Sequence, residues 1–351
     1  MENLKLNETP KRTSRNFNIN NIKIEDVVIP EKLEEFKNIE IIKSEDITFT
    51  SKFEYNNLKY GIDKDLEQIA KQKSNARLKA ELRNKENKVT LVFKQDKQNA
   101  NLMENIEIVA CKNTNCDITI KYETVEDLKG FHSGILRLNA EENSKVKVNI
   151  INFTNIESNI FLSIENTLKE NATVEYTIVD FGGKNRLTNY YSNILGKNAN
   201  NSLSTIYIGK ENQLFDLNYI AELYGEKSNI DIEVQGALRD KAKKHFKGTI
   251  DFKKGCKKAT GNENENCMLL SDTAKSIALP MLLCSEEEVE GNHSSSAGKI
   301  GEKELFYIMS RGFSKNEAMK LLVRAKFNSI LEKIDDNTKE EIITEMNKRL
   351  D

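Results

Sequence analysis

Apolar and polar residues alternate in short runs between residues 87 and 252, and the runs recur at a nearly constant spacing. Alternation with a period of two is typical of strands that bury one face. Two runs are closely alike: ENSKVKVNIINF at 142–153 and ENATVEYTIVDF at 170–181, 28 positions later. Equivalent strand starts, at intervals of 27 to 29 residues, fall at Val89, Ile118, Val146, Val174, Leu203 and Ile230.

A second apolar run falls near the middle of each unit. These second runs are Ile106–Ala110, Gly134–Leu138, Ile160–Ile164, Tyr190–Leu195, Leu217–Leu223 and Phe246–Ile250. Self-similarity at a fixed period indicates stacked structural units. Two strands and no helix per unit predict a mainly β fold, a right-handed parallel β-helix in which each coil covers its neighbour. A β-sandwich is the alternative. Its turns recur every 8 to 12 residues or so, but its sequence does not repeat at a spacing of 28 residues.

The residues before the repeat have a different character. Residues 1–25 are polar and aperiodic, which predicts a mobile arm. Residues 22–60 contain scattered apolar runs, which predict short strands or turns. Residues 63–84 are rich in helix formers and predict a solvated helix. The predicted organisation is residues 1–86 as a flexible arm with a helical or irregular segment, 87–297 as the parallel β-helix core, and 298–351 as a helical domain.

Beyond the repeat, an acidic-amide run at residues 262–266 precedes a predicted core strand, Cys267–Asp272. Small residues at Ser294–Gly298 predict a turn. A short amphipathic helix over 302–310 follows, with Arg311 at its end and Gly312 as the left-handed cap.

Ser314 and Glu317 then form a predicted capping box that opens the next helix. Its apolar face consists of Met319, Leu322, Val323, Phe327, Ile330, Leu331 and Ile334. A last helix begins near Thr338. These apolar faces must be buried against the end of the solenoid, each other or a partner.

Charge and composition exclude several classes of protein. The chain has 53 basic and 55 acidic residues, a net charge of -2, which argues against a dedicated nucleic-acid binder. No window approaches the roughly 18 apolar residues of a membrane span. The first residues lack the apolar core of a signal peptide, so we expect a cytoplasmic protein. Five irregularly spaced cysteines fit a reducing compartment better than a disulfide framework.

The motifs of common enzymes are absent from the sequence. There is no GxxxxGK[ST] phosphate loop, no HExxH, no GxSxG and no paired CxxC. We therefore expect no enzymatic activity in this chain. Cys111 and Cys116 are interpreted as ordinary thiols, and His132 and His245 as structural residues.

One stretch, Val289–Phe313, carries the best candidate chemistry. It contains His293, one of three histidines, at the predicted last coil. Neutral imidazole binds iron well, and cysteine thiolate suits iron–sulfur species. His293 is therefore the candidate metal ligand, with a structural histidine as the alternative. Cys267 and Cys284 lie in neighbouring coil sequences, and Cys267 is the second candidate.

Four passages in order resemble the SufB/SufD family of iron–sulfur cluster assembly proteins. They are Phe131–Gly134; Gly236–Lys241 with Phe246–Ile250; Met268–Asp272 with Ala274 and Pro280; and His293–Gly312. The resemblance covers residues 125–351. It implies a β-helix core with helical flanks, in a scaffold where SufB and SufD pair and each binds a SufC ATPase.

The resemblance also implies roles for individual residues. The helical tail that docks SufC maps to Leu305–Ile334, beginning with Phe306, Tyr307, Arg311 and Gly312. His293 matches the SufD histidine implicated in cluster assembly at the SufB–SufD interface. The essential SufB cysteine is replaced by Glu265, with Cys267 two residues later on the same strand face.

The chain is thus SufD-like, partnered by a SufB-type subunit or by an identical one. No tightly bound cofactor is expected, and an iron–sulfur cluster or iron would be held only transiently. Two alternatives remain open: a carbohydrate-active β-helix enzyme, and a structural solenoid that only mediates assembly.

Overall fold

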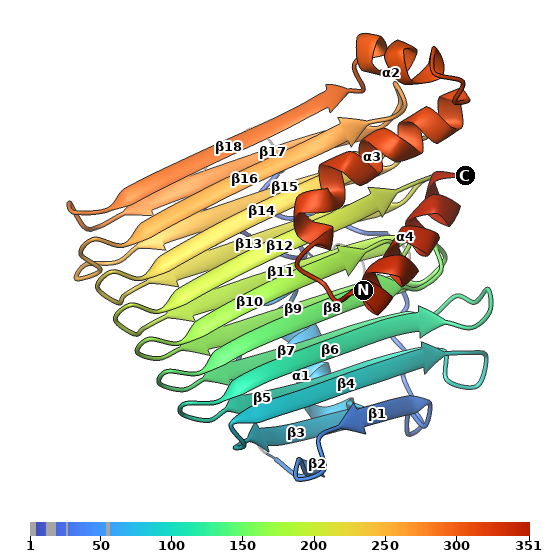
Figure 1. The fold of residues 1–351 in the computed structure, drawn as a ribbon. Helices are drawn as coiled ribbons and strands as arrows, with labels where there is room; N and C mark the ends of the chain where they lie inside the picture. Colours follow the sequence, from blue (N-terminus) through green and yellow to red (C-terminus); the bar gives the residue numbers. More distant parts are fainter. Residues whose placement is uncertain (1–4, 12–18, 26, 54–56) are drawn as a thin grey trace.

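The computed structural model describes residues 5–11, 19–25, 27–53 and 57–351. Two nine-stranded sheets face each other along the length of the molecule (Figure 1). Sheet 1 has the order β1-β4-β6-β8-β10-β12-β14-β16-β18, and sheet 2 the order β17-β15-β13-β11-β9-β7-β5-β3-β2.

The strands are β1 Ile39–Lys43, β2 Phe49–Thr50, β3 Ala76–Leu82, β4 Glu86–Gln95, β5 Asn101–Ala110, β6 Asn115–Thr124, β7 Phe131–Ala140, β8 Lys145–Phe153, β9 Asn159–Leu168, β10 Thr173–Asp180, β11 Asn185–Ile194, β12 Asn200–Gly209, β13 Leu214–Leu223, β14 Asn229–Leu238, β15 Lys243–Phe252, β16 Thr260–Leu269, β17 Lys275–Cys284 and β18 Glu290–Lys299. The helices are α1 Lys64–Lys73, α2 Glu302–Met309, α3 Lys315–Leu331 and α4 Asp336–Leu350.

Consecutive strands from β3 onward alternate between the two sheets. Each strand from β5 to β16 pairs in parallel with the strand one coil before it and the strand one coil after it, as β10 does with β8 and β12. This is a parallel β-solenoid, as the repeat predicted. The predicted repeat runs all lie in strands, apart from Leu195 just beyond the end of β11.

The repeat correctly predicted which side chains of each strand face inward, but it did not always predict which residues pair between neighbouring coils. Val146 lies beside Val174 as expected. Ile118, however, pairs with Val148 rather than Val146, and Leu203 pairs with Ile232 rather than Ile230. A shift of two residues leaves the same side chains facing inward, so the alternation alone cannot detect it. These inward side chains fill the space between the sheets, which we call the lumen, and form the largest apolar cluster.

Asparagines at one set of turns form a ladder between coils. Asn113, Asn143, Asn171 and Asn198 have φ between 55° and 61°. Each amide nitrogen in the later three donates to the side-chain oxygen of the asparagine one coil earlier, at 3.0 to 3.1 Å. Asparagine tolerates the left-handed region better than most residues, so the same residue satisfies both the turn and the stacking.

Before the repeat, parts of the arm and helix α1 pack on the outer face of sheet 2, whereas β1 joins sheet 1. Helix α1 is capped by Asp63, but the helix predicted over 63–84 is wrong in its second half. Residues 76–82 are strand β3, because pairing with β5 outweighs their helix propensity. The arm also differs from the predicted mobile segment: Leu6, Asn7 and Ile22 are buried. Residues 1–4 and 12–18 of that arm lie outside the described residues.

Two strands near the end of the solenoid were mispredicted. The run at 262–266 belongs to β16, so the strand begins at Thr260 and not at Cys267. The predicted turn Ser294–Gly298 is part of strand β18. Both lack apolar alternation, and β18 is held by lateral pairing with β16 and by side-chain bonds such as that from Ser294 to Asn264.

Helices α3 and α4 pack on the outer face of sheet 1 (Figure 1). Val323, Phe327 and Ile330 of α3, with Ile342 and Met346 of α4, meet a sheet surface formed by Ile151, Val179, Ile206, Ile208 and Ala237. The predicted capping box at Ser314 is present, and Gly312 has φ 98° as expected of a left-handed cap. No helix in the described residues is long and apolar enough to cross a membrane.

Candidate functional site

The two ends of the solenoid differ. At the amino-terminal end, β1 and β2 lie antiparallel against β4 and β3 and close the sheets. At the other end, β17 and β18 are the last strands of their sheets, and within the described chain no strand lies beyond them. Every residue of β18 is exposed. In solenoid proteins the sheet edges and the terminal coil are normally covered by a capping segment. Because this end has no such cover among the described residues, it is the candidate interface.

His293 lies on the last strand at this open end. Its Cα partner on β16 is Glu263, which is buried and faces the lumen. Ser295, two residues further, donates from its hydroxyl to Glu265 Oε2 at 2.7 Å. Because alternate residues of a strand share a face, His293 occupies the lumen side of the open coil. The structure thus puts this predicted ligand at the mouth of the lumen.

A buried ion pair lies one coil inside this mouth. Lys244 Nζ on β15 is 2.6 Å from Glu265 Oε1 on β16, and both side chains are fully buried. The pair joins sheet 2 to sheet 1 across the lumen. Together with Ser295, it connects the mouth to the interior through hydrogen bonds.

Glu263 is the second carboxyl in this region. Burial, with a contribution from the neighbouring Glu265 charge, raises the pKa of Glu263 to about 8. Its Oε1 has no hydrogen-bond partner among the described residues. Gly248 on the opposite sheet makes room for it, since a Cβ at that position would lie 1.8 Å from Glu263 Oε2. At neutral pH, Glu263 is therefore a protonated carboxyl beside the strand that carries His293.

This raised pKa predicts a pH dependence of stability. The folded state keeps the Glu263 proton up to about pH 8, whereas the unfolded chain releases it near the ordinary value of 4.5. The free energy of unfolding therefore falls as pH rises across that window, by at most about 1.4 kcal/mol per pH unit. Glu263→Gln should remove this decline, so that its stability relative to the wild type grows with pH in urea titrations from about pH 5 to about pH 8.

Glu290→Gln, on the exposed first position of β18, is the matched control and should leave the pH profile of the wild type unchanged. Parallel profiles for wild type and Glu263→Gln would contradict a buried protonated carboxyl.

Cys267 faces the lumen but is not beside His293. Its Cα partner on β18 is Ala297, four residues from His293, which corresponds to about 13 Å along the strand. Burial raises the pKa of the Cys267 thiol, while the Lys244 ammonium opposes this effect. The third residue of the predicted group, Cys284, is exposed at the end of β17 in the other sheet. The structure therefore does not gather the predicted thiols and imidazole into one site.

Helix α2 presents the predicted partner-binding residues. Phe306 is 72% exposed and Tyr307 59% exposed, and α2 has no buried residue. The Arg311 guanidinium donates to the Tyr307 hydroxyl at 2.9 Å and lies 5.1 Å from its ring centroid. Met309, Phe313 and Leu321 extend the same exposed set. In contrast, the apolar face of α3 is already used against sheet 1.

The remaining candidates are placed elsewhere. His132 is fully buried in the lumen, with Nε2 3.2 Å from Glu104 Oε1 and its ring 4.5 Å from that of Tyr122. His245 lies on the outer face of sheet 2, 3.8 Å from Asp216. Cys111 and Cys116 are free thiols.

The sequence analysis noted Glu265 only as the replacement of a cysteine, and it did not single out Lys244 or Glu263 for the candidate site. The signal that could have found them is the strict Asn–Glu alternation at 262–266, which has the period of a strand and puts both glutamates on one face. Among the described residues, no three histidine, cysteine or acidic side chains are placed to hold a metal ion.

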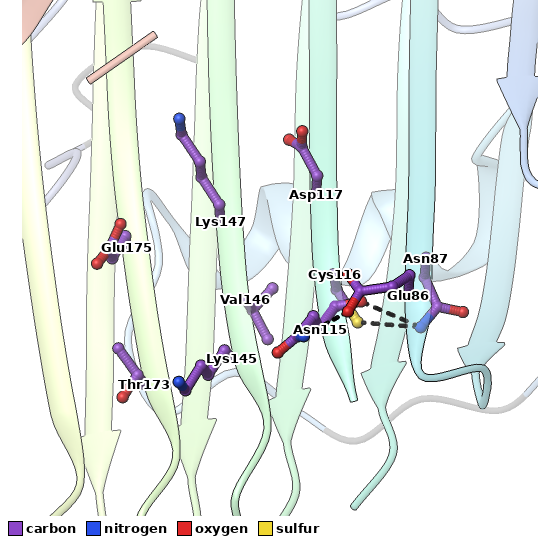
Figure 2. Close-up of a pocket in the computed structure, with 10 residues that line it drawn as sticks. All are labelled: Glu86, Asn87, Asn115, Cys116, Asp117, Lys145, Val146, Lys147, Thr173 and Glu175. Atoms are coloured by element: carbon purple, nitrogen blue, oxygen red, sulfur yellow. Dashed lines mark hydrogen bonds between the residues drawn. The ribbon is translucent and has the colours of Figure 1, made fainter. Parts of the chain in front are cut away.

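A groove of about 430 Å³ lies on the part of sheet 1 that the helices leave uncovered (Figure 2). Five charged residues line it, and three of them, Asp117, Lys147 and Glu175, are consecutive Cα partners on neighbouring strands. Lys147 separates the two carboxylates, so the charges alternate in sign across the strands.

Comparison with known proteins identifies the family. The model described as "SUF system FeS cluster assembly, SufBD core domain" matches residues 93–326, from β4 into α3. The chain belongs to the SufBD family. The SufBD match begins earlier than the resemblance at 125–351 and includes the open coil with His293 and all of α2.

Curated SufBD relatives are similar at modest identity. The iron–sulfur cluster assembly protein SufD of Bacillus subtilis is 29% identical over 132 residues, 38% of this chain and 30% of that protein. A SufBD family protein of Pyrococcus horikoshii is 31% identical over 167 residues, 47% and 36% of the two chains. SufD of Escherichia coli is 21% identical over 230 residues, 65% and 54%. The matched stretches thus span only about a third to a half of these relatives.

Proposed function

We propose that this chain is a SufD-like scaffold subunit on which iron–sulfur clusters are assembled. The main support is that the SufBD core domain matches the solenoid, including its open end. His293 lies on the last strand at that end. The cluster, or its iron, is cargo that the subunit holds transiently. The chain itself hydrolyses no ATP, in keeping with a sequence that has no phosphate-binding loop.

The proposed binding surface for a SufB-type or identical subunit is the end formed by β17 and β18. Both strands offer unpaired backbone groups that another strand can extend. In this arrangement His293 lies at the junction, where a partner can supply further ligands. Cys267, deeper in the lumen, is the second proposed contact for cargo.

The proposed binding surface for a SufC-type ATPase is α2 with the start of α3. Phe306, Tyr307, Met309, Phe313 and Leu321 form an exposed apolar set. The predicted docking module, Leu305–Ile334, is longer than this surface. Val323 and Phe327 of the module are buried against sheet 1, so they are not available to a partner. Arg311 holds the Tyr307 ring in place, and Gly312 permits the turn that separates α2 from α3.

Loss of the ATPase is the expected result of placing charge on α2. Phe306→Asp with Tyr307→Asp should reduce co-purification with a SufC-type ATPase at least about tenfold, since aromatic anchors dominate interfaces. Val125→Asp, at an equally exposed apolar residue far from α2, should leave binding intact. Undiminished co-purification of the α2 variant would contradict docking on this helix.

His293→Ala tests the cluster claim within the assembled complex. We expect less cluster after anaerobic reconstitution with iron and sulfide, read from the visible absorbance, with complex formation unchanged. Asn292→Ala is the matched control, because Asn292 precedes His293 on the same strand but faces outward and pairs with Asn262. Full reconstitution in His293→Ala would instead favour a solenoid that only mediates assembly.

A further inference from the structure

An asparagine of the amino-terminal arm is bound like a ligand on the outer face of sheet 2. Asn7 is fully buried and has φ 54°. Its Nδ2 donates to Asp216 Oδ1 at 2.6 Å and to the carbonyl oxygens of Thr188 and Asp216, both at 3.1 Å. Its Oδ1 accepts from Asn189 Nδ2 at 2.9 Å. Both ends of this side-chain amide are therefore satisfied.

The main chain around Asn7 is recognised as well. Lys247 Nζ donates to the Asn7 carbonyl at 2.7 Å and also contacts Asp216 Oδ1 at 2.7 Å. Asn218 Nδ2 donates to the carbonyls of Asn7 and Glu8. Lys247 and Asp216 are about 1% exposed, and burial lowers the pKa of Lys247. A buried ion pair of this kind is costly unless further hydrogen bonds complete it, and the arm supplies one of them.

The recognising side chains belong to successive coils. Asn189, Asn218 and Lys247 are consecutive Cα partners on β11, β13 and β15. The preceding partner in this row, Ser163 on β9, accepts from the Ile62 backbone at 3.2 Å. Leu6, next to Asn7, is buried with Phe161 and Leu187 in the apolar cluster of this face. Residues distant in sequence thus meet one short segment.

We propose that this row is a built peptide-recognition site, and that Lys5–Lys11 is its intramolecular ligand. The site selects an extended peptide with leucine followed by an asparagine that adopts the left-handed conformation. In a solenoid, each coil contacts only its neighbours, so ends can fray independently. A ligand bound to three coils at once couples them, and β15 is the direct neighbour of the open-end strand β17.

Hydrogen exchange on the full-length chain tests this inference. Asn7→Ala should raise exchange of the β13 and β15 amides at least about tenfold, as the loss of several buried hydrogen bonds implies. An excess of the peptide KLNETPK added in trans should restore the protection, and KLAETPK should not. Asn198→Ala has a matched φ of 55° but lies in the exposed ladder, and should change exchange only at its own turn.

A second variant guards against simple misfolding. Asn7→Asp loses the amide donors and sets a carboxylate against Asp216 and against the two backbone carbonyls that accept from Asn7 Nδ2, so exchange of the β13 and β15 amides should rise at least as much as in Asn7→Ala. The peptide KLNETPK added in trans should restore the protection in this variant too. Unchanged exchange in Asn7→Ala, equal effects of both peptides, or no recovery of Asn7→Asp with KLNETPK would each overturn the proposal.

Discussion

Glu265→Gln should lower the free energy of unfolding by about 3 to 5 kcal/mol, a large part of the stability of an ordinary domain. The substitution leaves the Lys244 ammonium fully buried without its counter-charge. The cost arises mainly from that uncompensated charge and less from the lost hydrogen bond. Urea unfolding at neutral pH measures the change directly.

The double variant Lys244→Met with Glu265→Leu distinguishes this cause from general damage to the core. Removing both charges together should restore most of the lost free energy of unfolding. A well-packed apolar pair fills the same space without the cost of removing two charges from water. Asp272→Asn provides the surface control, since the pair of Asp272 with Lys299 is solvent-exposed and should not shift the midpoint. A double variant as unstable as the single one would contradict this explanation.

Phe327→Ala should cost about 3 to 5 kcal/mol, because it opens a cavity between α3 and sheet 1. Phe327 is fully buried in the cluster that contains Ile206 and Met346. Thermal unfolding followed by circular dichroism measures the loss, and limited proteolysis shows whether α3 and α4 detach first.

Phe306→Ala is the matched control for this second prediction. It removes the same side chain from α2, where the ring is mostly exposed, and should leave the melting temperature unchanged. Equal destabilisation by the two substitutions would mean that α2 also packs on the body of the protein. The contrast separates a helix face that holds the fold together from a helix face that is free for a partner.

Local signals in the sequence were reliable wherever a few neighbouring residues determine the structure. The capping box from Ser314 to Glu317 is formed by a single turn of chain. Gly312 has the positive φ that its position after a helix suggested. The repeat also predicted the solenoid, because apolar and polar residues alternate along each strand according to whether they face inward or outward.

The candidate site was only partly predictable. His293 stays a prediction, to which the structure adds that its strand lies at the open end. The helices were identified, but their burial partner was left open among three possibilities. Sheet 1 is that partner, because the outward residues Ile151, Val179 and Ile206 happen to align across coils.

What the sequence determined by itself is therefore the period, the facing of the strands, the helix caps and the position of His293 after the last repeat. Only the tertiary structure decided the coil register, the pairing of Lys244 with Glu265 and the docking of Asn7 across three strands. The physical reason is that these contacts join residues of different coils. A shift of two residues preserves every inward face, so the alternation permits several registers, and only the packing of whole coils against each other selects one.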